Sequence, residues 1–180
     1  FINILGGAFH FVFELSGFWP PAALFASVNE STWEHLKFYF WSVLLWALIE
    51  YTYVRKEANN YWFAHAIGLL VTSVVVSIAF YAYLGVAIPK LGGGFLAADI
   101  STGVIGVIVG QIFASKIMQM PRLSPATLRW APILLVVLIA MFSTFTYYPP
   151  KIFLFEDFMG YEYRGQYGIL DDYTDYLIFE

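Results

Sequence analysis

Long stretches without a charged residue constrain this chain more than any other feature. No Lys, Arg, Asp or Glu occurs from Ala58 to Pro89, and none from Trp130 to Pro150. A helix needs about 20 apolar residues to cross about 30 Å of hydrocarbon. Because 60% of the residues are hydrophobic and 12% are charged, the sequence predicts an integral membrane protein.

Helices are the expected architecture, since backbone in hydrocarbon must satisfy its own hydrogen bonds and a barrel would show short alternating segments instead. We expect an all-α bundle of about five transmembrane helices over residues 1–150 and an extramembrane C-terminal tail over residues 151–180. The predicted spans cover about residues 1–16, 32–54, 61–84, 95–118 and 130–147.

The composition also excludes several kinds of chemistry. There is no cysteine, so disulfides, thiolate zinc sites and thiol redox reactions are ruled out. A net charge of −4 argues against nucleic acid as a partner, because phosphate backbones require basic patches. The expected partners are therefore the lipid bilayer and other membrane protein subunits.

The positions of the cations predict the orientation in the cell membrane. They gather in two connections, after the second span and between the fourth and fifth: Arg55, Lys56, Lys116, Arg122 and Arg129. An excess of Lys and Arg marks the cytoplasmic side. We therefore expect a cytoplasmic N-terminus and an acidic, aromatic tail outside.

The fourth predicted span carries small side chains at every fourth position: Ala98, Thr102, Gly106, Gly110 and Ala114. Such a stripe lets a second helix approach closely. It predicts packing against a helix of the same bundle, or alternatively a dimer contact.

Polar and ionisable residues concentrate at the predicted outer ends of the spans, and such residues in a membrane are costly and commonly functional. The candidate polar cluster consists of His10, Glu14, Asn29, Glu30, Trp33, Glu34, His35, Lys37 and Asp99. Imidazoles and carboxylates are ligands for Zn²⁺, Mn²⁺ or Fe²⁺. His10, Glu14 and His35 are the candidate ligands of a divalent metal, although no established metal motif is present.

Several of these residues also have a purely structural interpretation. Ser31 and Glu34 have the spacing of a helix capping box, and Lys37 is placed to neutralise a nearby carboxylate. Asp99 can cap its helix. At the predicted inner end, Glu50 is expected in an ion pair and His65 as a packing residue.

Two sequence segments resemble a prokaryotic family of small multi-pass membrane proteins known only as a domain of unknown function. The first runs from His10 to Gly17 and continues in the motif Asn29-Glu30-Ser31-Thr32-Trp33-Glu34-His35-Leu36-Lys37. The second runs from Phe145 to Ile152, continues through Asp157, and ends with Gly165-Gln166-Tyr167-Gly168-Ile169. The resemblance implies a fold and a pattern of residues, and it brings no established activity.

The tail departs from that family pattern, because the stretch from Leu170 to Glu180 runs beyond the usual end. Its aromatic residues Tyr173, Tyr176 and Phe179 are candidates for docking on a partner, since aromatics are enriched at interfaces. The alternative is a disordered, solubilising tail.

Three functions fit these observations. The first is a non-catalytic subunit of a larger membrane complex, whose polar cluster fixes helices or holds a small ligand. The second is a metal-dependent membrane hydrolase that uses His and Glu at the outer face. The third is a pathway for protons or a small solute, although no internal repeat of the transporter kind is visible. We favour the first.

Overall fold

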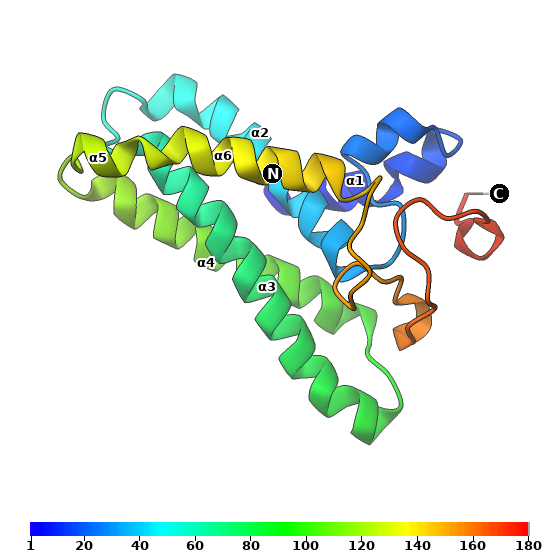
Figure 1. Ribbon diagram of the computed structural model, residues 1–180. Coiled ribbons are helices and arrows are strands. Elements are labelled where there is room, and N and C mark those ends of the chain that lie inside the picture. Colours follow the sequence, from blue (N-terminus) through cyan, green and yellow to red (C-terminus); the bar gives the residue numbers. More distant parts are fainter. Residues whose placement is uncertain (180) are drawn as a thin grey trace.

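The computed structural model describes residues 1–179, and every regular element within them is helical (Figure 1). The α-helices are α1 (Ile2–Leu15), α2 (Thr32–Val54), α3 (Tyr61–Leu91), α4 (Leu96–Gln119), α5 (Pro125–Leu128) and α6 (Trp130–Thr144). The 3₁₀ turns are η1 (Pro20–Leu24), η2 (Met159–Tyr161) and η3 (Thr174–Tyr176).

Three helical segments are long and apolar enough to cross a membrane. They are α3, α4 and the combined α5–α6 segment Pro125–Thr144, whereas α1 is apolar but shorter. The chain thus has the helices of a membrane protein. The full number of five spans stays a prediction.

Helix α3 is longer than the predicted third span. It continues beyond residue 84 to Leu91, through Pro89, and ends at Gly92, whose φ of +80° is left-handed. Glycine adopts that conformation without a steric penalty and is a common helix terminator. The glycine, and not the proline, therefore sets the end of this helix.

The small-residue stripe of α4 faces α3 of the same chain. Ideal Cβ atoms built on Gly106 and Gly110 would lie 3.2 Å from the Thr72 carbonyl oxygen and 2.7 Å from the Gly68 carbonyl oxygen, respectively. Thr102 and Ala114 of the same stripe are also buried, whereas Ala98 is only partly buried. The two helices pack closely because these positions lack bulky side chains.

Replacing Gly110 by alanine is expected to lower stability by about 1–3 kcal/mol, because the added methyl would overlap α3 backbone and Thr72. Gly85 is the matched control, since nothing lies within 4 Å of its Cβ position. Gly85→Ala should leave stability unchanged or raise it slightly. Thermal unfolding of both variants in detergent checks this, and equal melting temperatures would contradict it.

Helix α2 supplies the aromatic core that joins it to α6. Trp33 stacks on Phe142 with ring centroids 4.4 Å apart, and Phe40 stacks on the same ring at 4.6 Å. The Trp33 backbone N–H also donates to the carbonyl of Leu154, at 2.9 Å. These contacts fix the start of α2 against α6 and the chain that follows it.

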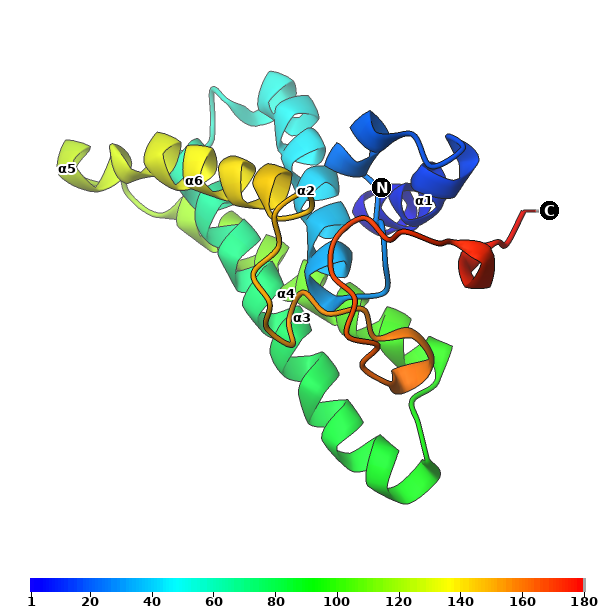
Figure 2. The same cartoon turned by 45° about the vertical axis from the view of Figure 1, so that its right-hand side comes forward.

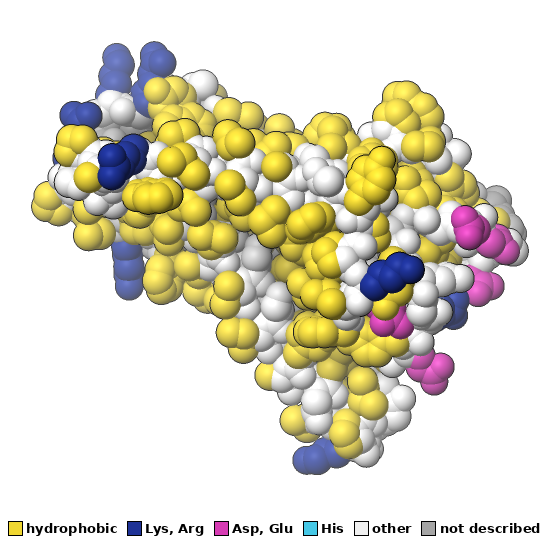
Figure 3. Space-filling view, in the orientation of Figure 1, with side chains coloured by type: hydrophobic (Ala, Val, Ile, Leu, Met, Phe, Trp, Pro, Cys, Tyr) yellow, Lys and Arg dark blue, Asp and Glu magenta, His cyan; other side chains and the backbone are white. Residues whose placement is uncertain are grey.

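The two cation-rich connections lie together at one end of the molecule. The Asn59 N–H donates to the Met118 carbonyl at 2.9 Å, and Asn60 binds the segment after α4 through both ends of its side-chain amide. On the face shown in Figure 3, most Lys and Arg side chains lie at the α5 end and the Asp and Glu side chains at the opposite end.

The chain after α6 packs back onto the bundle without forming a strand within the described residues. A single antiparallel bridge joins Glu156 and Tyr167. Beyond it, the segment 170–179 runs along α1 and the loop that follows α1 (Figure 2). This arrangement brings the C-terminal segment to the end of the molecule that carries the polar residues.

Candidate functional site

Two histidines and a glutamate meet where α1 faces the start of α2. His10 comes from α1, Glu30 from the loop before α2, and His35 from the first turns of α2. One ligand atom from each residue lies within 4.8 Å of the others. We call these three residues the histidine cluster.

The spacing within the histidine cluster suits an ion better than direct hydrogen bonds. His10 Nε2 lies 3.5 Å from Glu30 Oε1, and His35 Nε2 lies 3.6 Å from Glu30 Oε2. Hydrogen bonds between such atoms are about 2.7–3.2 Å long. Zinc–ligand bonds of about 2.0–2.2 Å in tetrahedral geometry place two donors about 3.3–3.6 Å apart.

The ring of His35 is held in the orientation that a metal ligand needs. Its Nδ1 lies 2.9 Å from the Ser31 carbonyl oxygen, so Nδ1 carries the proton and donates it. The other ring nitrogen, Nε2, lies on the side of Glu30, 3.6 Å from its Oε2. A backbone carbonyl on the second ring nitrogen is a usual support of metal-bound histidines.

Glu30 is positioned by a residue far along the chain. Its backbone N–H donates to Asp157 Oδ1 at 2.9 Å, and Asp157 is fully buried. Burial by itself raises the pKa of the Glu30 carboxyl, but His10 and His35 outweigh that effect and lower it to about 2. Glu30 is therefore ionised and available to a cation throughout the physiological range.

A small cavity of about 40 Å³ lies beside the histidine cluster, lined by His10, Glu14 and Glu30 and by residues of the C-terminal segment. That volume accommodates two or three water molecules. It provides room for the hydration shell of a bound ion.

The C-terminal segment forms part of the wall of this cavity. Tyr173 stacks on Phe18 with ring centroids 4.5 Å apart, and burial raises its pKa to about 12. The Tyr176 hydroxyl donates to Asp157; burial and that carboxylate raise the pKa of Tyr176, which keeps the donor protonated. Phe179 meets Phe11 edge to face. The aromatic residues predicted to dock on a partner thus contact their own chain.

Glu14 lies in the cavity wall but not in the histidine cluster. Its Oε1 accepts hydrogen bonds from the backbone N–H groups of Ile178 and Phe179, at 2.6 and 2.8 Å. The structure therefore groups His10 and His35 with Glu30, and it uses Glu14 to hold the C-terminal segment.

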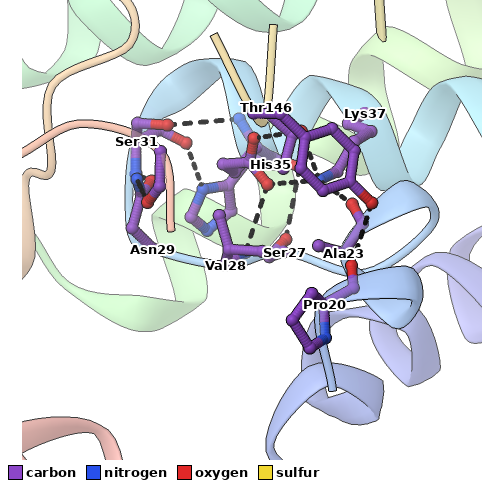
Figure 4. A network of polar contacts seen from close by, with 12 residues as sticks. Pro20, Ala23, Ser27, Val28, Asn29, Ser31, His35, Lys37 and Thr146 are labelled. Carbon is purple, nitrogen blue, oxygen red and sulfur yellow. Dashed lines mark hydrogen bonds and ion pairs between the residues drawn. The ribbon is translucent and has the colours of Figure 1, made fainter. Parts of the chain in front are cut away.

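A second polar group is fully buried one turn further into α2 (Figure 4). The Lys37 ammonium donates to Glu34, to the Ala23 carbonyl and to Thr146 Oγ1. Thr146 in turn donates to Glu34 Oε1 at 2.8 Å. All three ammonium protons are used, so this network fixes α2, η1 and the end of α6 and offers no free group for chemistry.

The expected capping box is formed only in part. Ser31 Oγ accepts from the Glu34 N–H at 3.3 Å, as predicted, but the Glu34 carboxylate binds Lys37 and the Val28 N–H instead of the Ser31 N–H. Asn29 takes that role, because its Oδ1 accepts from the Ser31 N–H at 2.9 Å. The need to neutralise buried Lys37 explains the difference.

The remaining candidates have other contacts. Asn29 Nδ2 donates to the Gly168 carbonyl at 2.9 Å, and Trp33 belongs to the aromatic core. Asp99 accepts a hydrogen bond from the Tyr161 hydroxyl at 2.6 Å and makes no side-chain cap. Asp99 therefore belongs neither to the histidine cluster nor to the lining of the cavity beside it.

Glu50 and His65 meet at the other end of the molecule. His65 Nε2 lies 3.0 Å from Glu50 Oε2, and His65 is almost completely buried. From the sequence, we expected Glu50 in an ion pair and His65 as a packing residue, without connecting the two. The structure shows that their side chains are neighbours.

Sequence reasoning gave no individual role to Asp157 or Thr146, and it assigned Tyr176 to a partner surface, whereas the Tyr176 hydroxyl binds Asp157 of the same chain. A signal for Thr146 existed, because it is a polar residue near the end of a long apolar run. Asp157 gave no comparable signal, because its partner Glu30 lies 127 residues away in the sequence.

Comparison with known proteins gives one match. A family model described as "Family of unknown function (DUF6512)" matches residues 1–169. No curated protein and no solved structure matches the chain. The matched region includes the histidine cluster and Asp157, whereas Tyr173, Tyr176 and Phe179 lie beyond it.

Proposed function

The chain belongs to this family of unknown function, and we propose from its geometry that it is an integral membrane protein that holds a divalent metal ion at His10, Glu30 and His35. The observation that carries the proposal is the convergence of three donor atoms within 4.8 Å. Two imidazoles and one carboxylate form a donor set suited to Zn²⁺, with Fe²⁺ and Mn²⁺ as further candidates.

The arrangement around the ligands supports a site that binds an ion. The Ser31 carbonyl orients His35, and Asp157 orients the backbone of Glu30. Side chains of the histidine cluster are about one quarter to one third exposed, so an ion can enter from solvent. Supporting hydrogen bonds of this kind are typical of metal sites.

The proposed role is non-catalytic. A three-ligand site leaves a position for water, as in zinc hydrolases, which keeps a hydrolase as the second candidate. However, the cavity beside the cluster is only about 40 Å³, and the C-terminal segment forms part of its wall. This small space favours an ion that stabilises the assembly of α1, α2 and the loop between them.

The proposed topology places the histidine cluster outside. The cation-rich connections lie at one end and the histidine cluster is held by the chain after α6. With the cations in the cytoplasm, the site faces the exterior. A role as subunit of a larger complex is compatible with this topology, although a partner would dock on surfaces other than the buried faces of Tyr173 and Tyr176.

Titration of the detergent-solubilised, metal-stripped protein with Zn²⁺ is expected to show saturable binding of one ion per chain. Glu30→Gln should weaken binding strongly, because it removes the only charged ligand while preserving side-chain size. Since metal-bound imidazoles must be neutral, affinity should also fall as the pH is lowered from about 7.5 to about 5.5. Glu30, with its pKa of about 2, stays charged over that range.

Glu162→Gln is the matched control, because Glu162 is exposed in the chain after α6 and lies outside the cluster and cavity. This variant should bind Zn²⁺ like the wild type. Equal weakening by both substitutions, or no stoichiometric binding by the wild type with any of the three metals, would refute the site.

A further inference from the structure

An open hollow lies at the cationic end of the molecule, far along the chain from the histidine cluster. It has a volume of about 530 Å³ and is lined by Arg122, Leu123, Ser124, Pro125, Leu128 and Arg129. Ligand sites in proteins commonly measure about 300–1,000 Å³. The hollow combines two guanidinium groups with two leucine side chains, so it is both cationic and apolar.

Neither arginine of the hollow has an acidic partner within residues 1–179, because the ion pairs of that part of the chain involve other residues. Both are exposed. Further cations occupy the adjoining helix end and the neighbouring connection: Lys116, Arg55 and Lys56. The acid among them is Glu57, so the local charge is clearly positive.

Asn60 holds the segment that carries Arg122. Its Nδ2 donates to the carbonyls of Ile117 and Pro121, at 3.1 and 3.2 Å, and its Oδ1 accepts from the Leu123 N–H at 2.8 Å. Arg122 therefore lies between two residues fixed by one buried side chain. Such fixing lowers the conformational cost of binding an anion there.

The surface that continues from the hollow along α6 is apolar. Trp130 at its start is 50% exposed, and Ile133 and Val136 further along are 47% and 64% exposed. The same face is covered by hydrophobic side chains in Figure 3. Tryptophan is favoured at the membrane–water interface, and the apolar face beyond it suits acyl chains.

We propose that this hollow binds the phosphate group of an anionic phospholipid, with the acyl chains along α6. Guanidinium groups bind phosphate oxygens through paired hydrogen bonds, and basic pockets on the cytoplasmic side of membrane proteins suit anionic headgroups. The adjoining apolar face favours a lipid over a soluble phosphate. This inference rests on the proposed membrane insertion and is independent of the metal site.

The test is native mass spectrometry of the full chain released from vesicles of phosphatidylglycerol and phosphatidylcholine. The wild type should retain phosphatidylglycerol in preference to phosphatidylcholine. A double variant, Arg122→Gln with Arg129→Gln, should retain about 10- to 30-fold less. The control removes the same charge elsewhere, through Lys90→Gln and Lys151→Gln, which replace exposed cations outside the hollow.

Asn60→Gly provides a second variant in which all charges remain. Glycine tolerates the positive φ of 57° at this position, but it cannot hold Pro121 and Leu123. We expect it to weaken retention of phosphatidylglycerol by several fold. Equal loss in the lysine control would overturn the site, since it would show a general effect of net charge.

Two further measurements separate the possible failures. Displacement of the lipid by millimolar inorganic phosphate would overturn the lipid assignment in favour of a free-anion site. Alkaline carbonate extraction tests membrane insertion directly. Protein that resists extraction yet shows no preference for phosphatidylglycerol would overturn this inference alone, whereas protein released by carbonate would overturn the proposed insertion.

Discussion

Lys37→Met should lower the stability of the protein by about 3–5 kcal/mol, which corresponds to a melting temperature lower by roughly 10 °C. Lys37 is completely buried, and its ammonium group neutralises buried Glu34. Without it, the carboxylate stays in an apolar environment without a cation, and the Ala23 carbonyl loses its donor. Thermal unfolding followed by tryptophan fluorescence in detergent measures the effect.

The matched control is Lys90→Met, because Lys90 is exposed and makes none of the ion pairs within residues 1–179. It should leave the melting temperature nearly unchanged. Adding Glu34→Gln to Lys37→Met should restore part of the lost stability, since the unpaired charge is then removed. A loss of less than about 1 kcal/mol in Lys37→Met would contradict the described network.

His10→Ala and His35→Ala should each weaken Zn²⁺ binding at least about 100-fold. Loss of a supporting residue around a metal typically costs about 10- to 100-fold in affinity, and loss of a direct ligand costs more. Both substitutions remove imidazoles that face the same carboxylate. Competition titration against a zinc chelator of known affinity measures the change for the solubilised variants.

The double variant distinguishes a shared site from two separate effects. If His10 and His35 bind the same ion, the combined loss in binding free energy should be smaller than the sum of the single losses. Full additivity would argue against one site. Glu14→Gln serves as the control: it should bind Zn²⁺ nearly as the wild type does, because Glu14 contacts the backbone of Ile178 and Phe179 instead of the cluster.

Much of the architecture can be predicted from local sequence. Uncharged apolar runs predicted helices that the structure places close to the expected ranges, such as α2 at Thr32–Val54. The end of α3 was less predictable, because Pro89 and Gly92 both signal a helix end and the glycine determines it. The small residues of α4 predicted a close contact with another helix, and in the structure α3 of the same chain makes this contact.

The candidate site was predictable only in part. Helical spacing placed His10 and Glu14 on one face, and the sequence therefore favoured Glu14 as a ligand. The structure brings Glu30 to the histidines instead, because its loop is bound to Asp157 and Gly168. Contacts between residues 127 or 139 positions apart leave no periodic signal in a single sequence.

The hydrogen bonds of Asn29 to Gly168 and of Glu30 to Asp157 also affect the order in which the protein can fold during synthesis. A ribosome synthesises the loop with Glu30 before α3 to α6, whereas the partners of that loop, Asp157 and Gly168, emerge only after α6. Domains generally fold as units while the N-terminal part appears first. The loop with Glu30 can therefore take its final shape only after α3 to α6 have been made, and binding of the proposed metal ion would follow that step, so a chain truncated before Asp157 should not form the site.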